Sequence, residues 1–154
     1  EREWADYSAA AKQLNLQLVS LEIRSGADVP AAYAEAARQQ VQAIAIFSAP
    51  TLIVGSGTLI AEQAVAHRIP TVSHLPLYAR SGGLMSYGAS PTLFMREAAG
   101  FVDRILKGAN PAEMPVQAPK RASLTLNPQA AKAIGLTIPP QMLARADEVV
   151  DTAP

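Results

Sequence analysis

The sequence of 154 residues contains no cysteine. This excludes disulfides, thiolate nucleophiles and zinc–thiolate sites, but it leaves the compartment open, because an oxidising compartment does not require disulfides. An excess of charge of one sign is also missing, since 13 basic and 13 acidic residues give a net charge of zero. The densest basic group is only the pair Lys120 and Arg121. We therefore expect no nucleic-acid partner, because such binding needs a basic surface.

Long apolar runs are absent as well. No stretch of the sequence approaches the roughly 20 apolar residues that span a bilayer, and no signal peptide is visible. The first residues already show a helical pattern, with Trp4, Tyr7, Ala11 and Leu14 spaced by three or four and no N-cap before them. We therefore expect a fragment of a longer protein, so the missing signal peptide does not indicate the localisation.

Apolar residues are plentiful, at 49% of the chain, which is enough for a buried core. Up to residue 88, short strand patterns alternate with helix patterns. Strands are predicted at 16–23, 41–47, 69–74 and 84–88, helices at 29–40 and 59–67, and loops at 48–58 and 75–83. This alternation predicts the α/β class, with a mainly parallel sheet and helices on both faces.

Beyond residue 88 the clearest helix of the chain is predicted at 91–107. Ser90 is placed to cap it, and Gly108 to end it in a left-handed conformation. An extended proline-rich connector follows. A strand at 122–127, a helix capped by Asn127 and a last helix at 139–150 complete the prediction.

The glycine-rich segments lack the residues of phosphate-binding loops. The stretch that begins at Gly55 does not have the third small residue of a dinucleotide fingerprint, and no lysine follows the glycines at 82–88. The two histidines, His67 and His74, have no acidic residues at ligand spacing. We therefore expect neither a cofactor nor a metal.

Nucleophilic catalysis is the alternative that these residues leave open. It would pair His74 with a serine, for which Ser48, Ser81 and Ser86 are candidates. The sequence contains no G-x-S-x-G motif, in which a strained turn would expose such a serine. This enzyme hypothesis is therefore the weaker one, and we expect no catalytic residue.

Ligand binding is favoured by the position of the loops, since ligands of parallel sheets bind beyond the carboxyl ends of the strands. The segments that follow the predicted strands offer short polar groups and two tyrosines, Tyr78 and Tyr87. These suit a small organic ligand with one polar and one flat or apolar part. The alternative is that both tyrosines are packing residues in ordinary turns.

Several motifs together resemble the C-terminal half of ABC-transporter substrate-binding proteins of the tryptophan- and tyrosine-binding type. They are SGGLMSYG at 81–88, the helix end ILKGANP at 105–111, the strand that closes in Asn127, and the segment AIGLTIP at 133–139. The resemblance covers nearly the whole chain. It implies one lobe of a type I periplasmic-binding fold, in which two α/β lobes close on a ligand.

The resemblance also implies a division of the chain. Residues 1–88 would form the second lobe, residues 89–108 a return helix that belongs to a missing first lobe, and residues 109–154 the segment that completes the second lobe. The positions that match the cleft of the family are Ser48, Ala49, Pro50, Pro76, Tyr78, Gly82, Gly83, Ser86 and Tyr87. Gly82 and Gly83 are expected to turn the chain at the rim of the cleft.

The function that the resemblance implies is solute binding for an ABC importer, without chemistry. The ligand would be an amino acid, an aromatic acid or another organic acid. The partner would be a membrane permease, and the location the periplasm or the cell exterior, at the membrane. The loop at 48–52 has no carboxylate for a ligand amino group. A cytosolic ligand-sensing domain is the alternative, and a hydrolase a weaker one. The fragment alone is expected either to dimerise through helix 91–107 or to pack this helix in a non-native way.

Overall fold

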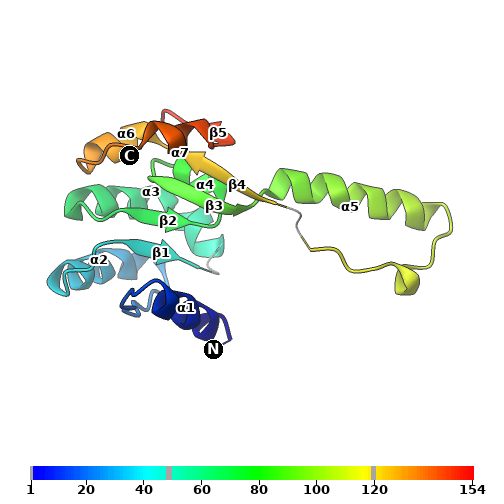
Figure 1. The fold of residues 1–154 in the computed structure, drawn as a ribbon, viewed down its shortest axis with the longest axis horizontal. Helices are drawn as coiled ribbons and strands as arrows, with labels where there is room; N and C mark the ends of the chain where they lie inside the picture. Colours follow the sequence, from blue (N-terminus) through cyan, green and yellow to red (C-terminus); the bar gives the residue numbers. More distant parts are fainter. Residues whose placement is uncertain (1, 48–49, 119–120) are drawn as a thin grey trace.

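In the computed structural model, residues 2–47, 50–118 and 121–154 are described. They form a five-stranded sheet in the order β1-β2-β3-β4-β5 (Figure 1). Its strands are β1 (Ile44–Ile46), β2 (Thr71–Ser73), β3 (Met85–Ala89), β4 (Ala122–Leu126) and β5 (Glu148–Val149). The first three strands are parallel, β4 is antiparallel to β3, and β5 is parallel to β4. The α/β class with a mainly parallel sheet is thereby confirmed.

Helices connect the parallel strands, as the alternating pattern predicts. The α-helices are α1 (Arg2–Gln13), α2 (Val29–Arg38), α3 (Pro50–His67), α4 (Pro76–Arg80), α5 (Pro91–Leu106), α6 (Pro128–Ala133) and α7 (Pro140–Ala144). Two 3₁₀ turns, η1 (Gly26–Asp28) and η2 (Pro111–Glu113), precede α2 and follow α5. All of these α-helices except α1 have a proline in their first turn. Proline is tolerated there because the N–H that it lacks would have no partner within the helix.

The core lies between one face of the sheet and helices α2, α3 and α4. Ile46 of β1 packs there with Val29, Ile60 and Tyr78, which come from the three helices. The hydroxyl of Tyr33 shares a hydrogen bond of 2.7 Å with Thr71 Oγ1 and thereby ties α2 to β2. Burial raises the pKa of Tyr33 to about 12. All of these side chains are at most 9% exposed.

The loops predicted at 48–58 and 75–83 are wrong in the part that the structure describes. Residues 50–58 belong to α3, and residues 76–80 form α4. The glycines that suggested a loop are tolerated because α3 is kinked at Ser56 and because Ile53 and Ile60 are buried on either side of the kink. Core packing therefore outweighs the low helix propensity of this segment.

Two further predictions are wrong near the ends of the chain. Residues 16–23 are not assigned to a strand, although their leucines alternate. The helix predicted at 139–150 is limited to α7, and Glu148 and Val149 pair instead with β4 as strand β5. The carboxylate of Asp147 stops the helix, because it accepts the N–H of Leu124 at 2.9 Å and thereby directs the chain onto the sheet.

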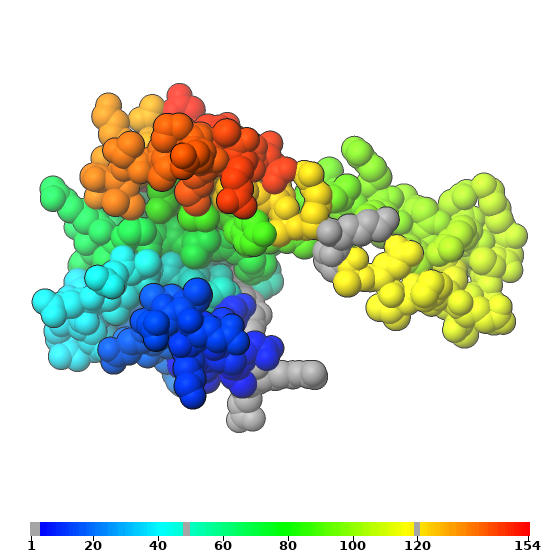
Figure 2. Space-filling view, in the orientation of Figure 1, coloured from blue at the N-terminus to red at the C-terminus, as the bar shows by residue number. Residues whose placement is uncertain are grey.

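Helix α5 projects away from the sheet and its covering helices (Figures 1 and 2). Ser90 caps it by accepting the N–H of Leu93 at 3.4 Å, and Gly108 follows its end at φ +97°, both as predicted. None of its residues is buried. Its apolar side chains are therefore exposed, with Phe94 at 51%, Val102 at 54% and Ile105 at 41%.

Candidate ligand-binding edge

The carboxyl ends of β1, β2 and β3 share one edge of the sheet, because the three strands are parallel. Helix α5 starts at the same edge, directly after β3, and extends away from it (Figure 1). In open parallel sheets this edge is where ligands bind. We refer to it as the carboxyl edge, and to the opposite edge as the amino edge.

Aromatic side chains lie at the carboxyl edge. Phe47, which follows β1, stacks on Tyr7 of α1, with ring centroids 3.6 Å apart and an angle of 17° between the planes. Tyr87 lies near the end of β3 and is 60% exposed. Forty residues separate Tyr7 from Phe47, so no local pattern in the sequence revealed this pair.

The passage from β3 into α5 is fixed by a close backbone contact. A β-carbon at Gly88 would lie 2.3 Å from the carbonyl oxygen of His74, which follows β2. Only glycine allows this approach. The Nδ1 atom of His74 is buried and has no hydrogen-bond partner among the described residues. The imidazole of His74 therefore has a nitrogen at this edge that forms no hydrogen bond within the described residues.

A row of small polar residues crosses the sheet just behind this edge. Ser73, Ser86 and Thr125 are neighbours on β2, β3 and β4 and are at most 2% exposed. The hydroxyls of Ser86 and Thr125 are buried without hydrogen-bond partners among the described residues. Ser86 therefore lies inside the domain, below the surface of the carboxyl edge.

The structure places the residues expected in the cleft at different depths. Ser48 and Ala49 lie outside the described residues. Pro50 and Tyr87 are exposed at the carboxyl edge, whereas Pro76 is buried where α4 begins. Tyr78 is 0% exposed. Burial raises the pKa of Tyr78, and its place in the core favours a packing role.

Gly82 and Gly83 lie at the amino edge of the sheet. They precede β3, whereas Tyr87 lies near its end, which puts about 13 Å of strand between Gly83 and Tyr87. The expected turn at the rim of the cleft is not found, because α4 carries the chain back across the sheet before the glycines. A β-carbon at Gly82 would meet the backbone of Ala153 and Pro154, and one at Gly83 the ring of Tyr78.

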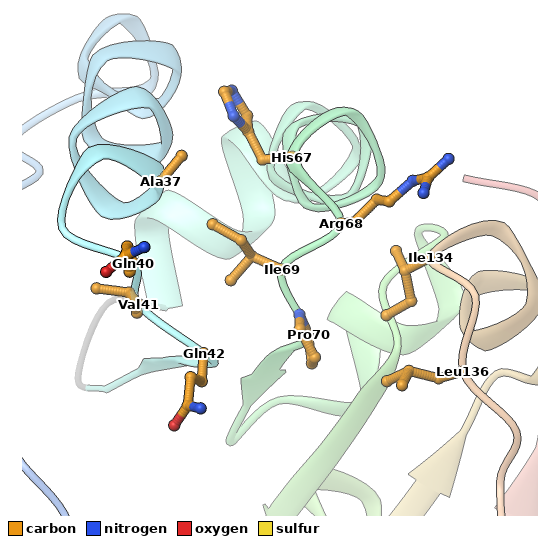
Figure 3. Close-up of a pocket in the computed structure, with 10 residues that line it drawn as sticks. All are labelled: Ala37, Gln40, Val41, Gln42, His67, Arg68, Ile69, Pro70, Ile134 and Leu136. Carbon is orange, nitrogen blue, oxygen red and sulfur yellow. The ribbon is translucent and has the colours of Figure 1, made fainter.

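A pocket also lies at the amino edge (Figure 3). It has a volume of about 450 Å³ and lies where β1 and β2 begin and α2 and α3 end. Val41, Ile69 and Ile134 form its apolar part, and His67 and Arg68 border it. It contains none of the residues expected in the cleft.

Other kinds of site find little support in the described residues. No group of three or more metal-ligating side chains occurs among residues 2–47, 50–118 and 121–154. Within the same ranges, no helix is both long enough and apolar enough to span a bilayer. No hydrogen bond joins His74 to Ser81 or Ser86 in this part of the chain, and Ser86 is 0% exposed.

Comparison with known proteins gives the family. The chain belongs to the ABC transporter substrate binding protein family, which matches residues 5–150. This is a family of substrate-binding proteins, in agreement with the predicted resemblance. A comparison with curated proteins finds no match.

Solved structures of similar fold are about twice as long as this chain. A conserved domain protein from Vibrio cholerae matches with a TM-score of 0.80 and 25% identity, over 93% of this chain and 48% of its own. An ABC domain from Streptococcus pneumonia in complex with L-Trp matches with a TM-score of 0.80 and 20% identity, over 97% and 51%. A ligand-free, open substrate-binding protein with adhesive properties from Clostridium difficile matches with 0.71 and 17%, over 95% and 48%.

Proposed function

We propose that residues 1–154 contain the second lobe of a solute-binding protein that delivers a small organic ligand to an ABC permease. The observation that carries this proposal is the carboxyl edge of the sheet. An exposed tyrosine, a stacked aromatic pair and an unpartnered imidazole nitrogen lie there, at the point where α5 leaves the domain. The family of the chain and the half-length match to its structural relatives support the same conclusion.

The ligand would be held between this edge and a first lobe. Contacts with both lobes favour the closed state, and the closed form would be the one that the permease recognises. The protein would then be periplasmic or extracellular and held near the membrane. Catalysis has no part in this mechanism.

We propose a smaller set of contact residues than the sequence suggested. Pro50 and Tyr87 remain, because both are exposed at the carboxyl edge, and Ser48 and Ala49 precede Pro50 in the chain. Tyr7, Phe47 and His74 join them. Pro76, Tyr78, Ser86 and the two glycines are better explained by the packing of the lobe.

The ligand class follows from these side chains. Aromatic rings favour a ligand with a flat or apolar part. His74 is partly exposed, unlike Tyr78 and Ser86, and its imidazole can hydrogen-bond a polar group. An aromatic amino acid or an aromatic acid fits both. The relative from Streptococcus pneumonia, which was solved with L-Trp, makes L-tryptophan the first compound to test.

We also propose that α5 packs on the first lobe, because it projects beyond the carboxyl edge with its apolar side chains exposed (Figure 1). Residues 89–108 would then belong to the first lobe, and residues 109–154 would return to the second. In the absence of a first lobe, two copies of residues 1–154 would pair through α5.

The experiment that tests the function is a thermal-shift screen of the full-length protein. It would include L-tryptophan, L-tyrosine, aromatic acids and small carboxylates. A compound present at 100 times its dissociation constant should stabilise the folded state by about 2.7 kcal/mol. If no compound of these classes raises the melting temperature, while the protein unfolds cooperatively, the proposed ligand class is wrong.

A cytosolic ligand-sensing domain of the same fold is the second candidate. It shares the carboxyl edge and differs in what it contacts after it binds a ligand. Copurification of the full-length protein with a membrane permease would favour transport, and sequence-specific DNA binding would favour regulation.

A further inference from the structure

The outer edge of β1 has no strand partner among the described residues, because β1 is the first strand in the sheet order. Ile44 donates its N–H to Pro70 on the inner side, at 2.8 Å. Successive residues of a parallel strand direct their backbone groups to opposite sides. The N–H and C=O of Ala45 therefore point outward, and Ala45 is exposed.

Residues 17–23 show the burial pattern of a strand without its pairing. Val19, Leu21 and Ile23 are partly buried, whereas the residues between them are exposed. Leu21 and Ile23 pack against the core cluster that also contains Ile46 of β1. Across the described ranges of the chain, no backbone–backbone hydrogen bond involves residues 17–23.

Two rows of unpaired backbone groups thus border the same core. Unpaired N–H and C=O groups along the edge of a sheet form a template on which a further strand can pair. Residues 17–23 and β1 do not hydrogen-bond to each other. A single strand between them would supply partners for both rows.

We propose that one additional β-strand inserts between β1 and residues 17–23, parallel to both. Residues 17–23 and β1 run the same way, because with α2 they form a β–α–β crossover, and strands β1 to β3 of the sheet are parallel, so the new strand is placed in the same direction. One face of the new strand would lie on the core beside Val29 and Ile46. It would therefore consist of four to six mainly apolar residues, by the usual length and composition of such strands.

The strand is supplied by the same protein, outside residues 1–154. This source rests on the proposal that these residues are one lobe of a longer chain, and the structural relatives are about twice as long. With that strand in place, residues 17–23 become the outermost strand of the lobe. The leucines of this segment alternate as in a strand, although the structure shows no strand there. Pairing with the inserted strand would explain this alternation.

Hydrogen exchange at single amides tests this inference. The amide of Ala45 should exchange about 100-fold or more slowly in the full-length protein than in residues 1–154. The amide of Ile44, which is bonded to Pro70 in both, is the internal control. Equal and fast exchange of Ala45 in both chains, with Ile44 protected, would overturn the proposal.

Two other outcomes identify a different partner and would also reject the inserted strand. Protection of Ala45 in residues 1–154 at every concentration would mean that residues 17–23 pair directly with β1. Protection that appears only at high concentration would mean that a second copy of the chain provides the strand. All three outcomes are independent of whether a ligand binds, so they leave the proposed function to its own assay.

A matched pair of variants gives a second test of the inserted strand. Ala45→Pro removes the outward N–H but none of the bonds to β2, whereas Ala45→Ser keeps that N–H. We expect Ala45→Pro to lower the melting temperature of the full-length protein by about 5 °C relative to Ala45→Ser. In residues 1–154 the two variants should melt within about 1 °C of each other. An equal loss in both chains would contradict the inserted strand.

Discussion

The ring of Tyr78 lies directly against the backbone of Gly83. A β-carbon at Gly83 would stand 2.3 Å from both Cε1 and Cζ of the ring, and the N–H of Gly83 donates to the carbonyl of Tyr78 at 3.0 Å. Tyr78 is 0% exposed. The glycine is therefore required by the packing of a core tyrosine, at the edge of the sheet opposite to the proposed ligand site.

Gly83→Ala should destabilise the domain, because the methyl group has no space unless the Tyr78 ring moves. Overpacking of this kind costs about 1–3 kcal/mol. Chemical denaturation of the purified chain measures the loss. The control is Gly100→Ala in α5, where a β-carbon meets nothing within 4 Å and should stabilise the helix by about 0.5–1 kcal/mol. Equal stability of the two variants would show that Tyr78 does not pack on Gly83.

The sequence predicted well those elements whose signal is local. Helix α5 has a serine cap, a proline in its first turn and a glycine at its end, and Asn127 with Gly135 delimits α6 in the same way. The α/β class followed from alternation alone. Helix α4 and the first half of α3 were missed because prolines and glycines suggested loops, whereas buried contacts at Ile53 and Tyr78 make these segments helical.

The site was predictable only in part. Tyr87 could be proposed as a contact residue because it lies near the end of a recognisable strand. Whether Tyr78 faces the ligand or the core depends on the turn of α4, which no local pattern determines. The stacking of Tyr7 on Phe47 and the contact of Gly88 with His74 join segments far apart in the sequence. Such contacts require the tertiary structure.

Asn127 links the C-terminal segment to α4. Its side-chain Nδ2 donates to the carbonyls of Ala79 at 3.2 Å and Thr152 at 2.8 Å, and its Oδ1 accepts the N–H groups of Gln129 and Ala130. Asn127→Ala removes these four hydrogen bonds and should therefore lower the free energy of unfolding by about 4 kcal/mol, at about 1 kcal/mol for each. Urea denaturation measures this loss.

The control is Asn110→Ala, because Asn110 caps the exposed turn η2. It should cost no more than about 1 kcal/mol. Asn127→Asp should be at least as damaging as Asn127→Ala, because a carboxylate would face the two carbonyl oxygens. A loss below 1 kcal/mol for both Asn127 variants would contradict this role.

Substitution of Tyr87 and of Tyr78 should distinguish a residue that binds the ligand from one that packs in the core. Tyr87→Ala should leave the stability of the full-length protein within about 0.5 kcal/mol, because its ring is 60% exposed, but should weaken ligand binding about tenfold. Tyr78→Ala should cost about 3–5 kcal/mol, because it empties the core. Calorimetric titration with the best compound of the screen, and thermal unfolding, provide the two readings. Unchanged affinity for Tyr87→Ala would remove this residue from the site.

Helix α5 should cause self-association of residues 1–154. Ile105→Glu places a charge on its apolar stripe and should shift sedimentation from dimer to monomer, because a buried unpaired carboxylate is strongly unfavourable. The control Arg96→Glu lies on the opposite face, nine residues or 2.5 turns away, and should leave the dimer intact. A wild-type chain that sediments as a monomer at high concentration would reject the dimer.

Alkaline pH should destabilise the domain through Tyr33. Its pKa is raised from 10.0 to about 12, first because the ring is buried, while the hydrogen bond to Thr71 acts in the opposite direction. The stability linked to this raised pKa is fully present below pH 10 and is lost as the pH rises from about 10 to 12. At pH 11 the free energy of unfolding should be about 1.4 kcal/mol lower than at pH 8 from Tyr33 alone.

The pKa of Tyr78 is raised as well, so both residues contribute in the same direction. Urea denaturation between pH 8 and 11 measures the slope, and it should be smaller in Tyr33→Phe and smallest when Tyr78→Phe is added. A slope that both substitutions leave unchanged would show that other groups govern alkaline unfolding.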